Sequence, residues 1–427
     1  MTHSLRKKLF FIFVALFCVI GVGLLYYTLG YRVDFSTWHL QKTGALYIET
    51  SLRPVSILLN GQSYQDKSSF IQRGTFISTV LPKRYRLVIG KDGYAPYEKN
   101  IIISPGQVTR LLHILMVPLQ TATTTYAHIP GNTIIDSNNG TALITHDSTK
   151  KIYYGIHLAA PSDITNLSSK IATLTRQPVL SLALYPQENN RLIIQTQTGL
   201  SAINLDTSAQ TPMIRSSNLL WWGIRNNNAY AISATTTPAG TGAPTSTAAL
   251  LSVFDLSLAK IAQTYTLITP TSISSADISP SRAALILKDG SLWSYSLTDG
   301  TYARIADTVK TAIFSPDGSR LLYQDRDGKT FVYLFDDDIV ALNAPRNTTL
   351  RIGILEAARV SQFRWMSDQY HILSIYPDKT TIAEITQTEP NNQFVIARTN
   401  NSSWYDADAK IFFTVAAGTL TAYNLDF

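Results

Sequence analysis

Residues Phe314 to Tyr323 read FSPDGSRLLY, and this stretch decides the fold of most of the chain. Its Pro-Asp-Gly turn, Pro316 to Gly318, separates two short apolar segments, the pattern of two antiparallel strands joined by a tight turn. Related segments occur earlier, as ADISPSRAALIL from Ala276 and LALYPQENNRLII from Leu182. The sequence therefore predicts a repeated β unit.

Weaker copies of the same unit extend the repeat toward both ends of this region. They are TIIDSNNGTALIT from Thr133, LLWWGIRNNNAYAIS from Leu219, QFRWMSDQYHILS from Gln362 and SSWYDADAKIFFT from Ser402. A third strand follows every copy, as in SLWSYSLT from Ser291 and TLTAYNLD from Thr419. A fourth, weaker strand usually leads to the next copy, and a period of roughly 36 to 50 residues is typical of four-stranded propeller blades.

The segment FSPDGSRLLY closely resembles the propeller repeats of the TolB type, which are related to the WD-repeat family. The resemblance implies that Pro316 to Gly318 form the turn between the first two strands and that Leu321 to Tyr323 pack between neighbouring blades. We expect an all-β propeller domain over residues 119–427 with seven blades, or six if the Leu219 copy is not a blade. A strand near Thr121 to His128 would complete the last blade and close the ring.

A smaller β module is predicted before the propeller, over residues 43–118. Its expected strands are 45–49, 55–59, 69–80, 85–89, 100–103 and 108–116, with hairpin turns at Asn60-Gly61 and Asp92-Gly93. The fragments VSILLNG, LPKRYRLVI, KDGY and ISPGQ make this segment resemble the PEGA domain, a small extracytoplasmic β-sandwich-like module. The sequence departs from that family where Arg53 to Ser56 replace the Pro-Glu-Gly-Ala tetrapeptide, and where Lys83 or Arg84 replaces a glycine. The resemblance implies a binding or spacer element.

An uncharged apolar run, Leu9 to Leu29, lies near the start of the chain and is long enough to cross a bilayer. Arg6, Lys7 and Lys8 precede it, so the positive-inside rule places a tail of residues 1–8 in the cytoplasm and the bulk outside. We expect a transmembrane helix over 9–29 and a juxtamembrane linker over 30–42. A cleaved signal peptide is the main alternative. A lipoprotein signal is disfavoured because Phe17 stands where a small residue should precede Cys18.

The composition indicates an ordered protein, since 45% of its residues are hydrophobic and 15% are charged. Cys18 is the only cysteine, which favours a bacterial-type envelope over an animal secretory pathway. The net charge of +7 is spread along the chain, apart from the N-terminal basic group and Lys83 to Arg86, so nucleic acid is not expected as a partner. The uncharged stretch Ala234 to Thr247 reads as a surface loop, with mucin-like glycosylation as the alternative.

Candidate chemical groups are few, and we predict no catalytic, cofactor-binding or metal-binding residue. The seven histidines, at positions 3, 39, 113, 128, 146, 157 and 371, lack zinc-ligand spacing and any identifiable catalytic partner. The run Asp336 to Asp338 lacks the ligand series of a calcium loop, so a solvated loop is favoured. The tryptophans at 221, 222, 293, 365 and 404 are expected to pack between blades rather than bind sugar.

These observations favour a non-enzymatic function. We expect a single-pass membrane protein that displays a propeller outside the cell membrane as a binding or scaffolding platform for a protein or cell-envelope polysaccharide, without a cofactor. The alternative is an envelope hydrolase or lyase with its site in the propeller channel, which would require acidic or histidine side chains to converge there. A sensor is disfavoured because the cytoplasmic tail is too short for a signalling domain.

Overall fold

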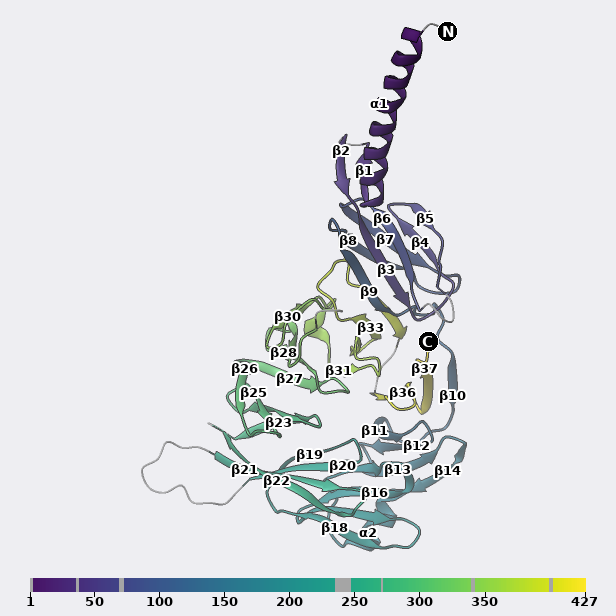
Figure 1. The fold of residues 1–427 in the computed structure, drawn as a ribbon. Helices are drawn as coiled ribbons and strands as arrows, with labels where there is room; N and C mark the ends of the chain where they lie inside the picture. Colours follow the sequence, from purple (N-terminus) through teal and green to yellow (C-terminus); the bar gives the residue numbers. More distant parts are fainter. Residues whose placement is uncertain are drawn as a thin grey trace, which may run out of the picture. The chain divides into compact units, whose positions relative to one another are not determined.

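The structure is a computed structural model that describes residues 3–35, 38–68, 73–234, 247–269, 272–338, 342–398 and 402–427. The chain divides into two compact units. The first holds Met1–Leu119 with the short segment Thr388–Asn392 and Phe427, and the second holds the rest. Most of the described residues lie in strands, as the sequence predicts (Figure 1).

The first unit begins with the apolar helix α1, His3–Thr28, whose span Arg6–Thr28 is long and apolar enough to cross a membrane and is 0% buried. The following segment is the one expected as a juxtamembrane linker over residues 30–42, and it contains two strands that were not predicted. It forms a two-stranded antiparallel hairpin of β1, Tyr31–Asp34, and β2, His39–Lys42. Sequence reasoning missed these strands because each has only four residues, which is short for a period-2 pattern to be recognised.

The small β module consists of two sheets that face each other. The three-stranded sheet has the order β6-β3-β9, with β6 at Thr75–Val80, β3 at Gly44–Thr50 and β9 at Val108–Ile114. The four-stranded sheet has the order β5-β4-β7-β8, with β5 at Gln62–Tyr64, β4 at Ser56–Leu59, β7 at Arg84–Gly90 and β8 at Tyr97–Ile102.

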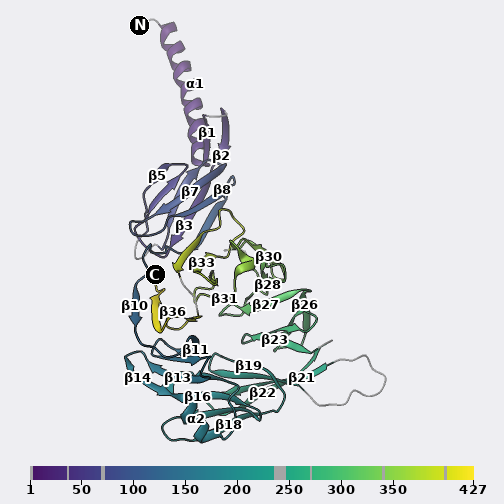
Figure 2. The ribbon, with the colours of Figure 1, turned by 180° about the vertical axis from the view of Figure 1, so that it is seen from behind.

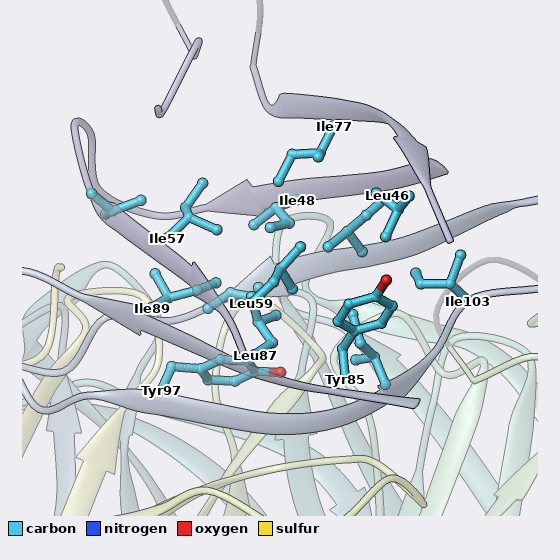
Figure 3. Close-up of a cluster of buried hydrophobic side chains, with 14 of the residues drawn as sticks. Leu46, Ile48, Ile57, Leu59, Ile77, Tyr85, Leu87, Ile89, Tyr97 and Ile103 are labelled. Carbon is cyan, nitrogen blue, oxygen red and sulfur yellow. The ribbon is translucent and has the colours of Figure 1, made fainter. Parts of the chain in front are cut away.

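The core of this module comes from the alternating residues of both sheets. Leu46 and Ile48 of β3 meet Leu59 of β4 and Leu87 of β7, and all four are at most 2% exposed (Figure 3). The predicted strands are confirmed in order, with two differences. The strand expected from residue 69 begins only at Thr75, residues 69–72 lying outside the described part of the chain, and β5 was not predicted.

In the described residues of the second unit we find seven four-stranded antiparallel sheets. The first sheet contains β11 Thr133–Asn138, β12 Ala142–Asp147, β13 Ile152–His157 and β14 Ala160–Asn166. The second contains β15 Ser181–Tyr185, β16 Glu188–Thr196, β17 Gly199–Asn204 and β18 Gln210–Arg215. The third contains β19 Leu219–Arg225, β20 Asn228–Ala234, β21 Thr247–Asp255 and β22 Lys260–Thr269. The fourth sheet contains β23 Ile273–Ile278, β24 Arg282–Leu287, β25 Leu292–Ser296 and β26 Tyr302–Ala306. The fifth contains β27 Val309–Phe314, β28 Arg320–Asp325, β29 Thr330–Leu334 and β30 Thr349–Ile352. The sixth contains β31 Gln362–Trp365, β32 His371–Ile375, β33 Thr380–Glu384 and β34 Gln393–Ala397.

The last sheet closes the ring in the way that the sequence predicted. It joins β35 Ser402–Asp406, β36 Ile411–Ala416 and β37 Thr419–Asn424 to β10, Thr123–Tyr126, which precedes all the other blades in sequence. Thr124 of β10 pairs with Ala422 of β37, and Figure 1 shows the two strands side by side. The prediction of a β-propeller is confirmed, and the Leu219 copy is a complete blade.

The turn and packing of the FSPDGSRLLY segment are also confirmed. Gly318 has a φ of +77° in the turn between β27 and β28, a conformation that favours glycine. Leu321 and Tyr323 pack with Ala284 of the preceding blade, whereas Leu322 packs with Phe363 of the next blade. This alternation follows from the two-residue period of a strand buried on both faces.

Two helical elements in the described residues of the propeller were not predicted, the helix α2 and a short 3₁₀ helix, η1, at Ala357–Arg359. Helix α2 spans Leu167–Thr175 between the first and second blades, with Asn166 as its N-cap and Leu167 and Ile171 buried. Its apolar residues at a spacing of four match a helix, but a segment of nine residues is too short to stand out against the strand pattern. The predicted loop Ala234 to Thr247 lies almost wholly outside the described residues.

Candidate functional site

A cavity of about 870 Å³ occupies the propeller where the first strands of the blades meet. All the first strands described above contribute residues to its wall, for example Asp136 of β11, Asp277 of β23 and Arg364 of β31. The wall contains both charged and apolar residues, such as Arg225 and Asp406 beside Leu184 and Ile313. We call this cavity the propeller channel.

Arg225 and Asp277 form one charged group in the channel wall. Arg225 Nη1 donates to the carbonyl of Ile278 at 2.7 Å, and Nη2 donates to the carbonyl of Ser315 at 2.5 Å. Nη1 also lies 3.7 Å from Asp277 Oδ2, which accepts a 2.6 Å hydrogen bond from the Phe314 amide. Burial raises the pKa of Asp277, and Arg225 opposes that rise. These contacts connect three successive blades, so Arg225 has a structural role.

Arg364 differs from Arg225 because its donors are not used by the protein. Its guanidinium lies over the Trp404 ring, 4.9 Å from the ring centroid. Throughout the described residues we find no hydrogen-bond acceptor and no ion-pair partner within contact distance of this guanidinium. Burial lowers its pKa, and the charges of Asp277 and Asp136 oppose that effect from a longer distance. The channel therefore offers a guanidinium whose N–H groups have no acceptor in the described part of the protein.

Asp136 is the most perturbed acid of the channel. Its Oδ2 accepts from the Leu184 amide at 2.8 Å, and its Oδ1 accepts from the Ser137 amide at 2.9 Å. Burial raises the pKa of Asp136 to about 7 in spite of these two hydrogen bonds, and the negative charge of Asp406 adds to the rise. Asp406 accepts from Ser137 Oγ at 2.7 Å. At neutral pH the Asp136 carboxyl exists in both protonation states.

The raised pKa of Asp136 predicts a pH-dependent effect of the Asp136→Asn substitution. In the unfolded chain the Asp136 carboxyl loses its proton at about pH 4, but in the folded chain it keeps the proton up to a pH of about 7. Ionisation of Asp136 therefore opposes folding increasingly between these two pH values. We expect Asp136→Asn to raise the free energy of unfolding by about 1–2 kcal/mol above pH 7, because the variant has no charge to bury and solvent in the channel weakens the effect. This gain over the wild type should disappear at about pH 4, where the Asp136 carboxyl is neutral in the folded chain. Urea unfolding at several pH values measures it.

Asp307→Asn is the matched control, because the Asp307 side chain is 75% exposed. Its stability should follow the wild type at every pH. Parallel pH profiles for Asp136→Asn and the wild type would show that the Asp136 carboxyl does not carry the raised pKa.

The histidines do not converge on the channel. In the described residues, none of them lines it. His371 Nδ1 lies 2.5 Å from Asp368 Oδ2, a pairing that sequence reasoning did not find. Asp368 Oδ1 also accepts from the amides of Tyr370 and His371, so this carboxylate closes a turn between β31 and β32. His371 is buried in that turn, whereas the Asp368 side chain is 35% exposed, and neither residue lines the channel cavity.

The acidic run Asp336 to Asp338 is not the fully solvated loop that was predicted. Asp338 forms a buried ion pair with Arg320 at 2.6 Å, and Asp337 accepts from the Arg346 amide. The sequence could not show this because Arg320 lies on another strand of the blade. Within the described ranges, no group of three or more His, Cys, Asp or Glu side chains is arranged to hold a metal ion.

The five propeller tryptophans pack against hydrophobic clusters, as predicted. Trp365 also donates from Nε1 to the Ile313 carbonyl of the preceding blade at 3.1 Å. Trp221 and Trp365 additionally contribute to the channel wall, and Trp404 supports Arg364. These aromatic residues therefore both hold the blades together and shape the cavity.

Sequence reasoning missed the charged residues of the channel, although a signal was present. Asp277 and Arg364 occupy the first-strand position that holds Ile313 in the clearest repeat copy. The strand pairing shows this equivalence, since Asp277 pairs with Ala284, Ile313 with Leu322 and Arg364 with Leu373 on the second strand of each blade. A charge at a position that is apolar in the best copy indicates that the position faces a polar space. The prediction of no catalytic, cofactor-binding or metal-binding residue stays a prediction.

Comparisons with known proteins give no family for this chain. No protein-family model matches it, and no curated protein sequence matches it. Among solved structures, a chain of the mitotic checkpoint complex aligns at a TM-score of 0.44 and 12% identity, covering 72% of this chain and 95% of its own. An oligogalacturonate lyase from Vibrio parahaemolyticus aligns at 0.49 and 8% identity, covering 71% and 97%. The propeller assignment rests on the sheets described above.

Proposed function

We propose that the chain is a membrane-anchored binding protein that displays its propeller outside the cell membrane and takes a partner through the propeller channel. The observation that carries this proposal is the unused guanidinium of Arg364 in a cavity of about 870 Å³. A buried charge without a hydrogen-bond partner is costly to the fold, so such a group is commonly retained for a ligand.

The charges of the channel limit what the partner can be. The guanidinium fork of Arg364 suits a carboxylate, which it binds with two parallel hydrogen bonds. Asp136 and Asp277 lie within electrostatic reach of Arg364 and would repel a purely anionic ligand. A group that carries both signs satisfies all three residues. Peptide segments with neighbouring acidic and basic side chains have this character, whereas a neutral polysaccharide does not, so a protein partner is the better match.

Membrane anchoring and orientation are parts of the same proposal. The helix α1 is fully exposed and apolar, and the basic residues Arg6, Lys7 and Lys8 precede its apolar run, which favours a cytoplasmic N-terminus. The small β module, which is PEGA-like in its strand and turn order, is proposed as an extracytoplasmic spacer or a contact to envelope polymer. None of these functions requires a cofactor.

Orientation and retention of the helix have a direct test. Leu258 is 61% exposed in the turn between β21 and β22. In a Cys18→Ser background, a cysteine introduced at position 258 should react with a membrane-impermeant maleimide in intact cells. Mass spectrometry of the membrane-bound chain should recover the α1 residues. Labelling only after permeabilisation contradicts the orientation, and loss of α1 from the mature chain indicates a cleaved signal peptide.

The binding role predicts that the partner depends on Arg364. The full chain is cross-linked reversibly in its native membrane, purified and analysed by mass spectrometry. We expect the wild type to recover a partner whose amount falls at least about tenfold with Arg364→Gln, because the bidentate contact of the guanidinium is lost. Arg364→Lys, which keeps the charge but lacks the fork, should also lose the partner while preserving the fold. Arg304→Gln removes an exposed arginine and is the control. An unchanged partner set in both Arg364 variants refutes the channel as the binding site.

A second proposal, an envelope hydrolase or lyase, is favoured by one observation. The pKa of Asp136 is about 7, a suitable value for a group that gives and takes protons at neutral pH. In this case purified chain should release products from envelope glycans or peptides, as measured by mass spectrometry, and Asp136→Asn should abolish the release. Product release that persists in Asp136→Asn would exclude Asp136 as the acid or base.

A further inference from the structure

The hairpin of β1 and β2 has one apolar face, and that face is exposed. Val33 and Leu40 are directly paired across the two strands. Phe35 and Trp38 lie in the turn that joins these two strands, and their rings form an edge-to-face pair at 5.9 Å. All four side chains are exposed: Val33 is 43% exposed, Leu40 48%, Phe35 75% and Trp38 79%. Exposed aromatic pairs of this kind are unusual on a water-facing surface.

The opposite face of the hairpin is polar. Arg32 pairs with Gln41 across the strands, and Asp34 pairs with His39. The hairpin is therefore amphipathic. An amphipathic element with one uncovered apolar face normally lies against a protein core or at a membrane interface.

Several contacts hold the hairpin against the C-terminal end of α1. The Arg32 guanidinium stacks 3.5 Å from the Tyr27 ring centroid and donates to the Tyr27 carbonyl at 2.9 Å. The rings of Tyr26 and Tyr31 pack edge to face at 5.5 Å. The Thr43 amide donates to the Gly30 carbonyl at 2.8 Å, which ties the end of β2 to the end of the helix. Both ribbon views show the hairpin beside the lower part of α1 (Figures 1 and 2).

A basic groove adjoins the base of the hairpin. It has a volume of about 550 Å³, and its wall includes Lys42 of β2 together with Lys83 and Arg84 at the start of β7. These three side chains are exposed. Clusters of lysine and arginine next to a membrane helix attract anionic lipid headgroups.

We infer that the β1–β2 hairpin is a second membrane contact, whose apolar face enters the interfacial layer of the bilayer beside α1 while the basic groove meets anionic headgroups. The inference rests on the proposed anchoring by α1. Tryptophan and tyrosine favour this layer because their rings are apolar and their N–H or O–H groups remain hydrated. The hairpin would then fix the direction in which the small β module leaves the membrane.

A lipid surface explains the hairpin better than a second copy of the chain. The hairpin is held against the C-terminal end of α1, whose exposed apolar surface the bilayer must already cover if the helix spans it. The neighbouring groove is basic, so two copies brought together at this point would repel each other. The same basic charge favours an anionic bilayer.

Quenching of Trp38 by lipid tests the inference on the full chain. The protein is reconstituted into phosphatidylcholine vesicles with and without brominated acyl chains, and tryptophan emission is recorded. Trp38 is the one tryptophan of the first unit, the other five lying in the propeller. We expect bromolipid quenching in the wild type, its loss in Trp38→Phe, and no change in the control Trp293→Phe. Added phosphatidylglycerol should increase the quenching, and Lys83→Gln with Arg84→Gln should remove that increase.

Two outcomes overturn the inference, and each can be separated from a failure of the anchor. Flotation of the chain with vesicles after alkaline extraction shows that α1 is inserted. If the chain floats but bromolipid quenches Trp38→Phe as much as the wild type, the hairpin does not enter the bilayer. If brominated lipid does not quench Trp38 and cross-linking yields a dimer through the hairpin, the apolar face of the hairpin joins two copies of the chain. A chain that does not float refutes the anchor itself.

Discussion

Replacement of Arg320 by methionine is expected to lower the free energy of unfolding of the propeller by about 3–5 kcal/mol. Arg320 Nη2 and Nε both donate to Asp338 Oδ2, at 2.6 Å and 3.2 Å. Nη1 donates to the Gln369 carbonyl of the next blade at 3.0 Å, and the guanidinium stacks 4.6 Å from the Tyr370 ring centroid. The side chains of the ion pair are only 7% and 11% exposed, so the substitution leaves Asp338 charged and buried.

Urea unfolding followed by tryptophan emission measures this effect, because five of the six tryptophans lie in the propeller. Arg304→Met is the matched control, since its partner is the exposed carboxylate of Asp307 at 2.8 Å. That substitution should change stability by less than about 1 kcal/mol. Equal effects of the two substitutions would show that the Arg320–Asp338 pair is hydrated and that Arg320 does not stabilise the contact with the next blade.

Substitution of Phe413 by alanine is expected to cost about 3–5 kcal/mol, because a fully buried phenylalanine leaves a cavity that the sheets cannot fill. Phe413 lies on β36 and is 0% exposed. It packs with Ile134 and Leu143 of the first blade and with Leu420 of the last. The cavity would therefore form at the junction where the ring closes. Loss of this contact should make the last blade separate more readily from the first.

The matched control for ring closure is Leu258→Ala, which removes an apolar side chain that is 61% exposed. Its effect on the free energy of unfolding should stay within about 0.5 kcal/mol. Limited proteolysis should cleave Phe413→Ala faster than the wild type near β10, the strand that closes the ring. Unchanged cleavage and an unchanged midpoint would contradict a contribution of the β36 core to closure.

Local pattern was enough to predict the blades. The FSPDGSRLLY copy has a turn that requires Gly318 and a second strand, from Arg320, whose apolar residues pack on both faces. Such signals lie within about ten adjacent residues, so they can be read without knowing what the strands contact. The closing strand β10 was also predictable, because the final copy supplies only three strands and a ring needs a fourth.

The channel could not be predicted in the same way. Asp136, Asp277 and Arg364 are separated by 87 to 228 positions in the sequence, and only closure of the ring brings their strands to one cavity. The free guanidinium of Arg364 is a property of what surrounds it, and the raised pKa of Asp136 is a property of burial. The Arg320–Asp338 pair was missed because its partners are 18 positions apart, outside one local segment, and the hairpin before the small module was missed because its strands have only four residues each.

The sequence by itself determined the apolar helix, the small β module and the repeated blades, because each depends on hydrophobic periodicity and turn residues within one short segment. Only the tertiary structure decided which side chains share the channel, which charges are paired in the interior, and which face of the β1–β2 hairpin is left uncovered. These properties depend on burial and on distances between strands that are far apart in the chain, and the energy of a charge or an apolar face changes with its surroundings rather than with its neighbours in sequence.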